Sequence, residues 1–156
     1  RIVLKSILLS SFYISYSALN QKMPYGQLEV YIGYARGLED QNWLTDMNPY
    51  VVITCHTEEK KTSTASGEGE DPEWNDSFLF TVTRGCDEVH IKIMDENTFQ
   101  DDDFIGETTI QLEEVFREGE VEATMYDLYN DDESCGSIKI GLTFTREERD
   151  ERDEDY

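Results

Sequence analysis

The sequence is poor in basic residues. Lysine and arginine total 13 against 35 aspartates and glutamates, giving a formal charge of −22 at pH 7. A negative charge of this size repels nucleic acid phosphates, so we expect no nucleic-acid partner. An anionic membrane would be repelled too, unless bound cations or a local basic patch reverse the potential at the docking face.

Cysteine is too scarce for a disulfide framework. The three cysteines, Cys55, Cys86 and Cys135, are odd in number and far apart. They also lack the paired spacing of a zinc site. We therefore expect free thiols, as in a reducing compartment.

Histidine is scarce as well, and no catalytic arrangement is visible. His56 and His90 fall within strand patterns, and no nucleophile has a base beside it in a motif. The clustered carboxylates resemble cation ligands more than acid–base partners. We expect no catalytic residues and no enzyme activity.

The chain divides into a leader, one domain over residues 24–145, and a tail. Residues 1–23 hold cations and a short apolar stretch but no acid. They form a passable signal peptide, too broken for a spanning helix; the alternative we favour is that Met23 is the true start. Residues 146–156 are highly charged and lack apolar periodicity, which predicts an acidic, disordered tail.

The domain itself shows the period of two that is typical of strands. Apolar and polar residues alternate or stay apolar over strand lengths, with turn signals between the runs. About eight strands result, which predicts an all-β sandwich. A helical turn fits residues 112–116. The clearest strand runs are residues 28–32, 50–53, 78–82, 89–93 and 138–144, and the weaker ones are 61–64, 107–112 and 123–128.

Acidic residues gather in three turns between strands, at Asp40–Asn48, Glu68–Asp76 and Asp95–Asp103. Loops at one end of a sandwich can converge, and converging carboxylates repel unless a cation lies among them. Oxygen ligands without histidine or cysteine favour calcium. An EF-hand is excluded, because Phe99 and Gln100 stand where a ligand and the turn glycine are needed.

The motifs in these turns resemble those of C2 domains. They are Gly37–Asp40, Met47–Val51, Asp71–Asn75, Lys92–Asp95 and Asp103–Glu107, in this order. The sequence is most similar to small single-domain plant C2 proteins of the elicitor-responsive type. The resemblance implies an eight-stranded antiparallel Greek-key β-sandwich, and the first and last strand patterns suggest the circularly permuted type II topology.

The resemblance also implies a set of aspartate ligands for calcium. By position these are Asp40, Asn48, Asp95, Asn97 and Asp103. Asparagine at two positions keeps a side-chain oxygen but removes a charge, so affinity should fall. We expect at most one weak calcium site. The neighbouring acids Asp46, Asp101 and Asp102 could donate oxygens or could simply be solvated.

Apolar residues lie in the same loops as the predicted ligands. Trp43 and Leu44 lie between Asp40 and Asn48, and Phe99 lies within the third loop. These side chains could enter a membrane interface. Alternatively, Trp43 or Phe99 could fold back over the end of the sandwich.

Two functions remain from this pattern. The first is calcium-dependent docking onto anionic phospholipid membranes in signalling or a stress and defence response. It implies a monomer that is cytoplasmic and moves to the membrane periphery when calcium rises. The second is a calcium-independent adaptor that binds a protein partner through its acidic surface. Asn48 and Asn97 favour the second function; the remaining aspartates and the loop aromatics favour the first.

Overall fold

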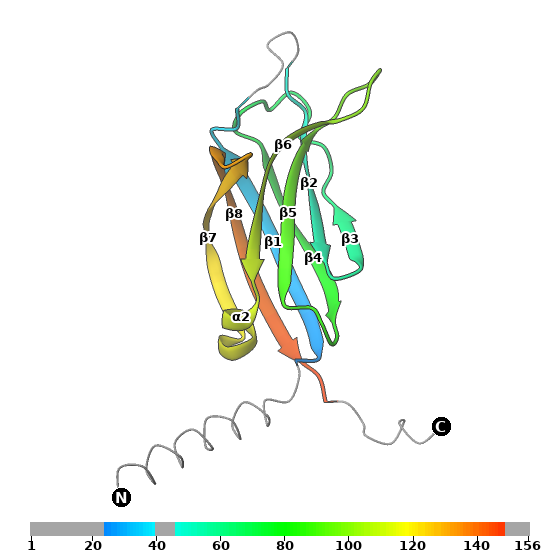
Figure 1. Cartoon of the computed structure of the whole chain (residues 1–156), viewed down its shortest axis with the longest axis vertical. Coiled ribbons are helices and arrows are strands. Elements are labelled where there is room, and N and C mark those ends of the chain that lie inside the picture. Colours follow the sequence, from blue (N-terminus) through cyan, green and yellow to red (C-terminus); the bar gives the residue numbers. More distant parts are fainter. Residues whose placement is uncertain (1–23, 40–45, 149–156) are drawn as a thin grey trace, which may run out of the picture.

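The computed structural model describes residues 24–39 and 46–148. Within these ranges the chain forms strands arranged in two layers, with one short helix at one end (Figure 1). The elements are β1 (Gly26–Arg36), β2 (Pro49–Cys55), β3 (Glu58–Lys61), β4 (Glu73–Val82), β5 (Glu88–Asp95), β6 (Asp103–Gln111), α2 (Glu113–Glu118), β7 (Glu120–Asn130) and β8 (Glu133–Arg146).

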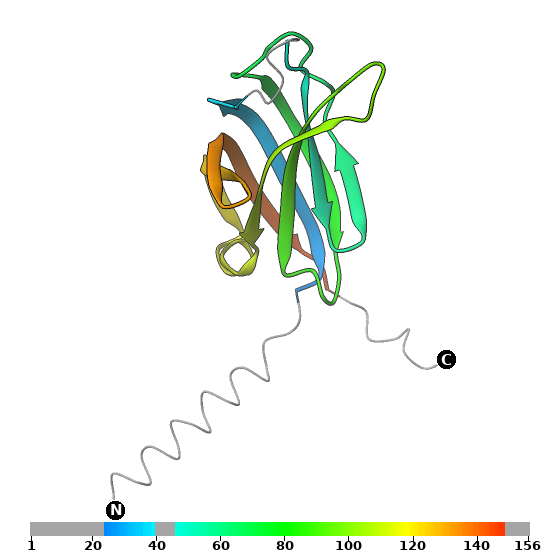
Figure 2. The same ribbon diagram turned by 45° about the horizontal axis from the view of Figure 1, so that its top comes forward.

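The strands form an antiparallel sandwich with the expected permuted order. Their sequence across the sheet is β3-β2-β5-β6-β7-β8-β1-β4. A single register pair, Glu107 with Tyr129, links β6 to β7, and there the sheet folds over so that β3-β2-β5-β6 covers β7-β8-β1-β4 (Figures 1 and 2). The first strand lies between the last strand and β4. The predicted all-β, eight-stranded fold is confirmed.

Alternation along each strand decides which side chains enter the core. In β1, Leu28 and Val30 are fully buried, whereas Glu29 between them is exposed. Ile91 and Ile93 of β5 follow the same rule from the facing layer. The two inner faces join in one apolar cluster, and burial of that surface is the main stabilising term for the fold.

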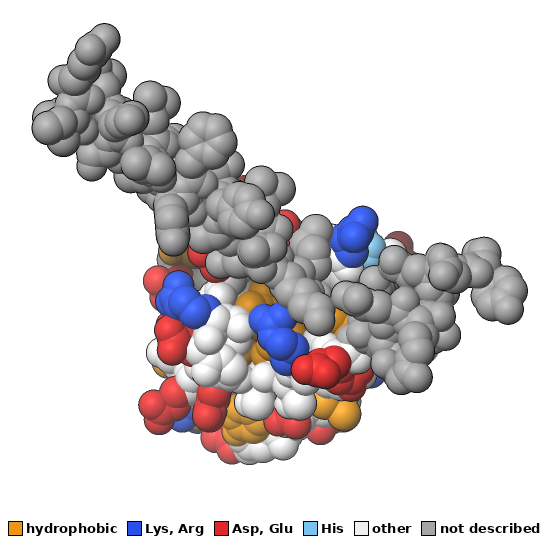
Figure 3. All heavy atoms as spheres, turned by 90° about the horizontal axis from the view of Figure 1, so that it is seen from below, with side chains coloured by type: hydrophobic (Ala, Val, Ile, Leu, Met, Phe, Trp, Pro, Cys, Tyr) orange, Lys and Arg blue, Asp and Glu red, His pale blue; other side chains and the backbone are white. Residues whose placement is uncertain are grey.

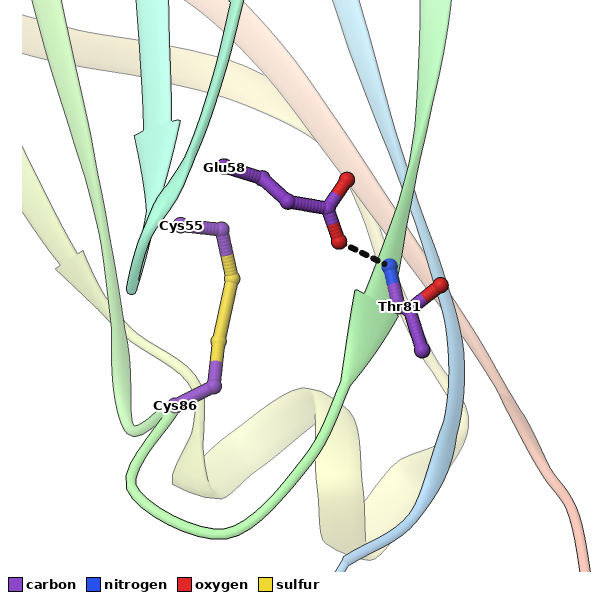
Figure 4. The surroundings of a disulfide bond; sticks show 4 residues. All are labelled: Cys55, Glu58, Thr81 and Cys86. Atoms are coloured by element: carbon purple, nitrogen blue, oxygen red, sulfur yellow. Dashed lines mark hydrogen bonds between the residues drawn. A yellow bond between two sulfur atoms is a disulfide. The ribbon is translucent and has the colours of Figure 1, made fainter.

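The two edge strands, β3 and β4, meet along one side of the sandwich. The Glu58 carboxylate accepts a hydrogen bond from the Thr81 amide over 3.0 Å (Figure 4). The Lys60 ammonium donates to the carbonyl of Leu79. Side chains of one edge thus occupy backbone groups of the other, which protects the edge of β4 from pairing with another chain.

The prediction of free cysteines is wrong for two of the three. Cys55, at the end of β2, and Cys86, in the β4–β5 turn, form a disulfide with their Cα atoms 6.3 Å apart (Figure 4). Pairing of β2 with β5 places Cys55 opposite Val89, and so beside the turn that holds Cys86. Cys135 is a buried free thiol. The disulfide removes the argument for a reducing compartment that rested on free cysteines.

One strand lies earlier than the alternation suggested. The pattern predicted a strand over residues 61–64, but β3 covers Glu58–Lys61. Its four charged residues carry no apolar signal, because an edge strand of this length buries little. The predicted leader (residues 1–23) and the end of the predicted tail (residues 149–156) lie outside the described residues.

Candidate functional site

Three connections lie together at one end of the sandwich, away from the end where β1 begins and β8 finishes (Figures 1 and 2). Asn48 contacts both of the others. Its backbone carbonyl accepts the amide of Glu96 at 2.9 Å, and its side-chain oxygen accepts the amide of Gly67 at 3.0 Å. The predicted convergence of the acidic turns is therefore seen for their described parts.

Asp95 is the buried acid of this end. It closes β5 with only 4% of its surface exposed, and its Oδ1 accepts the backbone amide of Asn48 at 2.7 Å. The register places Asp95 opposite Pro49 on one side and Asp103 on the other. A buried carboxylate needs such donors or a cation. Strand pairing brings Asp95 and Asp103 together, and the hydrogen bond from Asn48 adds a third predicted ligand position.

Asn97 closes the third loop on itself. Its side-chain amide donates to Oδ2 of Asp103 at 3.0 Å and to the carbonyl of Asp101 at 3.0 Å. An aspartate here would instead face Asp103 as a second negative charge. The asparagine thus satisfies one carboxylate of the predicted site with an internal donor.

Asp102 is held from both sides and was not recognised as structural from the sequence. Its Oδ2 accepts the hydroxyl of Tyr50 at 2.5 Å, and its Oδ1 accepts the amide of Asn97 at 3.0 Å. The Tyr50 hydrogen bond, with that amide, lowers the pKa of Asp102. Burial, and then the negative Asp102, raise the pKa of Tyr50 to about 12, so the pair is a neutral phenol donating to a carboxylate near neutral pH.

Acids of the second connection serve the backbone. Glu68 accepts the amide of Glu73 at 2.7 Å, and Asp71 accepts the amide of Gly37 at 3.0 Å. Glu68 thus supports the turn within the β3–β4 connection, and Asp71 ties that connection to the residue after β1. These two carboxylates are structural elements of the loop in the described geometry.

The described part of the predicted ligand set contains two carboxylates, Asp95 and Asp103, and two amides. Asp40 lies outside the described residues. Within residues 24–39 and 46–148, no group of three or more His, Cys, Asp and Glu side chains is placed to hold a metal ion. The donors that do converge are oxygens, which suit a hard cation such as calcium.

Phe99 stands at the tip of the third loop with its surface 100% exposed. It does not fold back over the sandwich, as one interpretation of the sequence suggested. Trp43 and Leu44 lie outside the described residues. At the opposite end of the molecule, acidic, basic and apolar side chains are interspersed on the visible described surface (Figure 3).

Comparison with known proteins matches residues 26–128 to the family model of the C2 domain. The chain belongs to the C2 domain family. Elicitor-responsive protein 3 of Oryza sativa subsp. japonica is 48% identical over 131 residues, covering 84% of this chain and 90% of that protein. The 16 kDa phloem protein 2 of Arabidopsis thaliana is 45% identical over 130 residues, covering 83% and 88%.

Solved structures agree on the fold. A C2 domain-containing protein from a candidate elicitor-responsive gene matches with a TM-score of 0.71 and 43% identity, over 82% of this chain and 94% of that one. A C2 domain of plant extended synaptotagmin 1 matches with a TM-score of 0.69 and 21% identity, over 81% and 98%. The resemblance to small plant C2 proteins is confirmed.

No helix among the described residues of this C2 domain is long and apolar enough to cross a membrane.

The sequence predicted the loops and the positions that face one another, but it did not indicate the role of Tyr50. Nothing in the local pattern separates Tyr50 from the other tyrosines, since its role depends on reaching a residue 52 positions away.

Proposed function

We propose that this C2 domain docks onto anionic phospholipid membranes through its loop end, in a signalling or stress and defence response. The observation that carries the proposal is the placement of Asp95, Asp103 and the fully exposed Phe99 at one end of the sandwich. An aromatic ring displayed beside carboxylates combines an apolar anchor with groups that can hold a cation.

One calcium ion is the cation we assign to this end. Asp95, Asp103 and Asp40 would hold it, with the side-chain oxygens of Asn48 and Asn97 as further donors. Three carboxylates and one calcium leave a charge of about −1, whereas a second ion would meet too little negative charge. When bound, the ion would neutralise the loops and attract lipid phosphates.

The residues then act as follows. Asp95 and Asp103 would hold the ion, and the backbone amide of Asn48 donates to Oδ1 of Asp95 and so fixes its carboxylate beside the loops. Phe99 enters the interface once repulsion between the acidic loops and the anionic surface is relieved. Binding would thus place the protein at the membrane periphery when calcium rises.

The second candidate is an adaptor that binds a protein partner without calcium. The hydrogen bond from Asn97 to Asp103 favours it, since that donor satisfies a ligand carboxylate without any ion. Under this alternative, the acidic surface would contact a basic patch on the partner.

Calorimetric titration of the full chain with calcium tests the assignment. We expect one site with a dissociation constant in the tens of micromolar or weaker, about what reduced ligand charge gives. Asp95→Asn should abolish the binding heat while the melting temperature stays high enough for the domain to remain folded. Binding that is unchanged in Asp95→Asn would refute the ligand assignment, and no binding by the wild type would favour the adaptor.

A further inference from the structure

Tyr50 links β2 to the loop between β5 and β6, which contains Asn97 and ends at Asp103. It lies one residue into β2, and its hydroxyl reaches Oδ2 of Asp102 at 2.5 Å. The same carboxylate accepts the amide of Asn97 at 3.0 Å through its other oxygen. The side chain of Asp102 is therefore anchored on β2 through Tyr50, and it also holds the backbone of Asn97 near the start of the loop.

The anchor matters because the loop between β5 and β6 has few other attachments to the rest of the domain. Asp95 and Asp103 face each other at its base, and the amide of Glu96 donates to the carbonyl of Asn48 at 2.9 Å. The side chain of Asn97 bonds only to Asp101 of the loop and to Asp103 at the start of β6. Without the Tyr50 link, the segment from Asn97 to Asp102 would be positioned by these short-range bonds. A strand residue fixes it relative to the sandwich, which a loop residue cannot do.

Two features strengthen this link. The acceptor is a carboxylate, and charge-assisted hydrogen bonds are about twice as strong as neutral ones. The Lys61 ammonium lies 5.9 Å from the centre of the Tyr50 ring and adds positive charge beside the pair.

We infer that Tyr50 is a positioning residue for the cation-binding loop, acting through Asp102 to set Asn97 and Asp103 relative to Asp95 before a cation arrives. The part of this inference that concerns calcium rests on the proposed function; the part that concerns loop geometry does not. Asp102, with both oxygens accepting hydrogen bonds, serves the loop as an anchor and not as a ligand.

The test compares Tyr50→Phe with Tyr31→Phe in the full chain. Tyr31 is the matched control, because its hydroxyl also donates to one side-chain oxygen, Oδ1 of Asn75 at 3.0 Å, but between β1 and β4. Two quantities are measured: the hydrogen-exchange rate of the Asn97 backbone amide without calcium, and the dissociation constant for calcium alone by calorimetry.

We expect Tyr50→Phe to speed exchange at Asn97 and to weaken calcium binding about tenfold, the lower end of what loss of an outer-shell partner costs a metal site. Tyr31→Phe should change neither. Asp102→Ala should speed the same amide, and the double variant Tyr50→Phe/Asp102→Ala should exchange no faster than Asp102→Ala alone, since both act through one link.

Each result decides the inference. Exchange at Asn97 that is equal in Tyr50→Phe and Tyr31→Phe overturns it, as does additive acceleration in the double variant. If the wild type binds no calcium, the proposed function fails; faster exchange confined to Tyr50→Phe and Asp102→Ala still supports the anchor. If calcium binds and Asp102→Ala weakens it as much as Asp95→Asn while Tyr50→Phe has no effect, Asp102 is a ligand and the inference is wrong.

Discussion

The asparagines at two predicted ligand positions make hydrogen bonds that need no cation. The amide of Asn97 donates to Asp103 at 3.0 Å, and the side-chain oxygen of Asn48 accepts the amide of Gly67 at 3.0 Å. Aspartate at position 97 could not donate and would repel Asp103, so it would order the loop only with a cation present. The hydrogen bond from Asn97 therefore orders the loop without a cation.

Replacing both asparagines by aspartate should raise the affinity for calcium and reduce the order of the calcium-free loop. We expect Asn48→Asp/Asn97→Asp to bind calcium at least about tenfold more tightly, or about 1.4 kcal/mol. The calcium-free double variant should also melt at a lower temperature than the wild type. Calorimetry and thermal unfolding measure the two effects.

Gln27→Glu is the charge control for this experiment, since it adds a negative charge at the start of β1, at the far end of the sandwich. It should leave the calcium affinity within about twofold, as expected for a distant, screened charge. An unchanged affinity in the double aspartate variant would show that positions 48 and 97 do not face the ion.

Tyr50 predicts a specific pH dependence on the alkaline side. Its pKa is raised from 10.0 to about 12, chiefly by burial, so the folded state keeps a proton that the unfolded chain loses. Stability from this group is complete below about pH 10 and is lost as pH rises toward 12. The free energy of unfolding should fall more steeply in the wild type than in Tyr50→Phe over this window. Parallel slopes of the free energy of unfolding against pH would contradict the raised pKa of Tyr50.

At the scale of elements, the contact of β6 with the start of β8 depends on a glycine. A Cβ added to Gly106 would lie 2.3 Å from Sγ of Cys135, a distance that no packed pair tolerates. We expect Gly106→Ala to destabilise the domain by about 1–3 kcal/mol, as overpacking does, measured by denaturant unfolding.

Replacing Cys135 by alanine removes the sulfur that the new methyl group would meet, and should restore stability to Gly106→Ala. In Gly106→Ala/Cys135→Ala the nearest neighbour of the new methyl becomes Cβ of Leu128 at 3.4 Å, an ordinary contact. Most of the lost stability should return. Equal stability of Gly106→Ala and the wild type would mean that the strands are farther apart than described.

The disulfide fastens the end of β2 to the β4–β5 turn, next to the contact between β3 and β4 (Figure 4). Its two cysteines are 31 residues apart, a separation for which the loop-entropy model gives about 3–4 kcal/mol. Reduction should lower the melting temperature by about 10 °C. The variant Cys55→Ser/Cys86→Ser should melt at the reduced value, with no further response to reductant, because Cys135 is already a thiol.

The sequence predicted the elements well where burial leaves a pattern. Alternation in residues 28–32 and 89–93 marked β1 and β5, because each buries one face. It misplaced β3, whose four charged residues bury no face. It also missed the disulfide and the Tyr50 link, since both depend on the pairing of β2 with β5, a register that local periodicity does not contain.

At the scale of the whole molecule, the net charge constrains the proposed docking onto membranes. The formal charge of −22 should hold the protein off anionic surfaces at low salt, where screening is weak. The proposed docking therefore requires a local change of charge at the loop end. A cation bound by the loop carboxylates, beside the exposed Phe99, would supply that change without altering the rest of the surface.

Sedimentation with phosphatidylserine-containing vesicles at low salt tests this account most directly, with wild type and Asp95→Asn compared in chelator and in millimolar calcium. Coordination and simple repulsion make opposite predictions for Asp95→Asn, which loses a ligand and a negative charge together. We predict that the wild type sediments only with calcium, that Asp95→Asn does not sediment in either condition, and that Phe99→Ala binds more weakly by about 1–2 kcal/mol. Wild-type protein that stays in the supernatant in millimolar calcium, or Asp95→Asn that sediments as well as the wild type, would contradict calcium-switched docking.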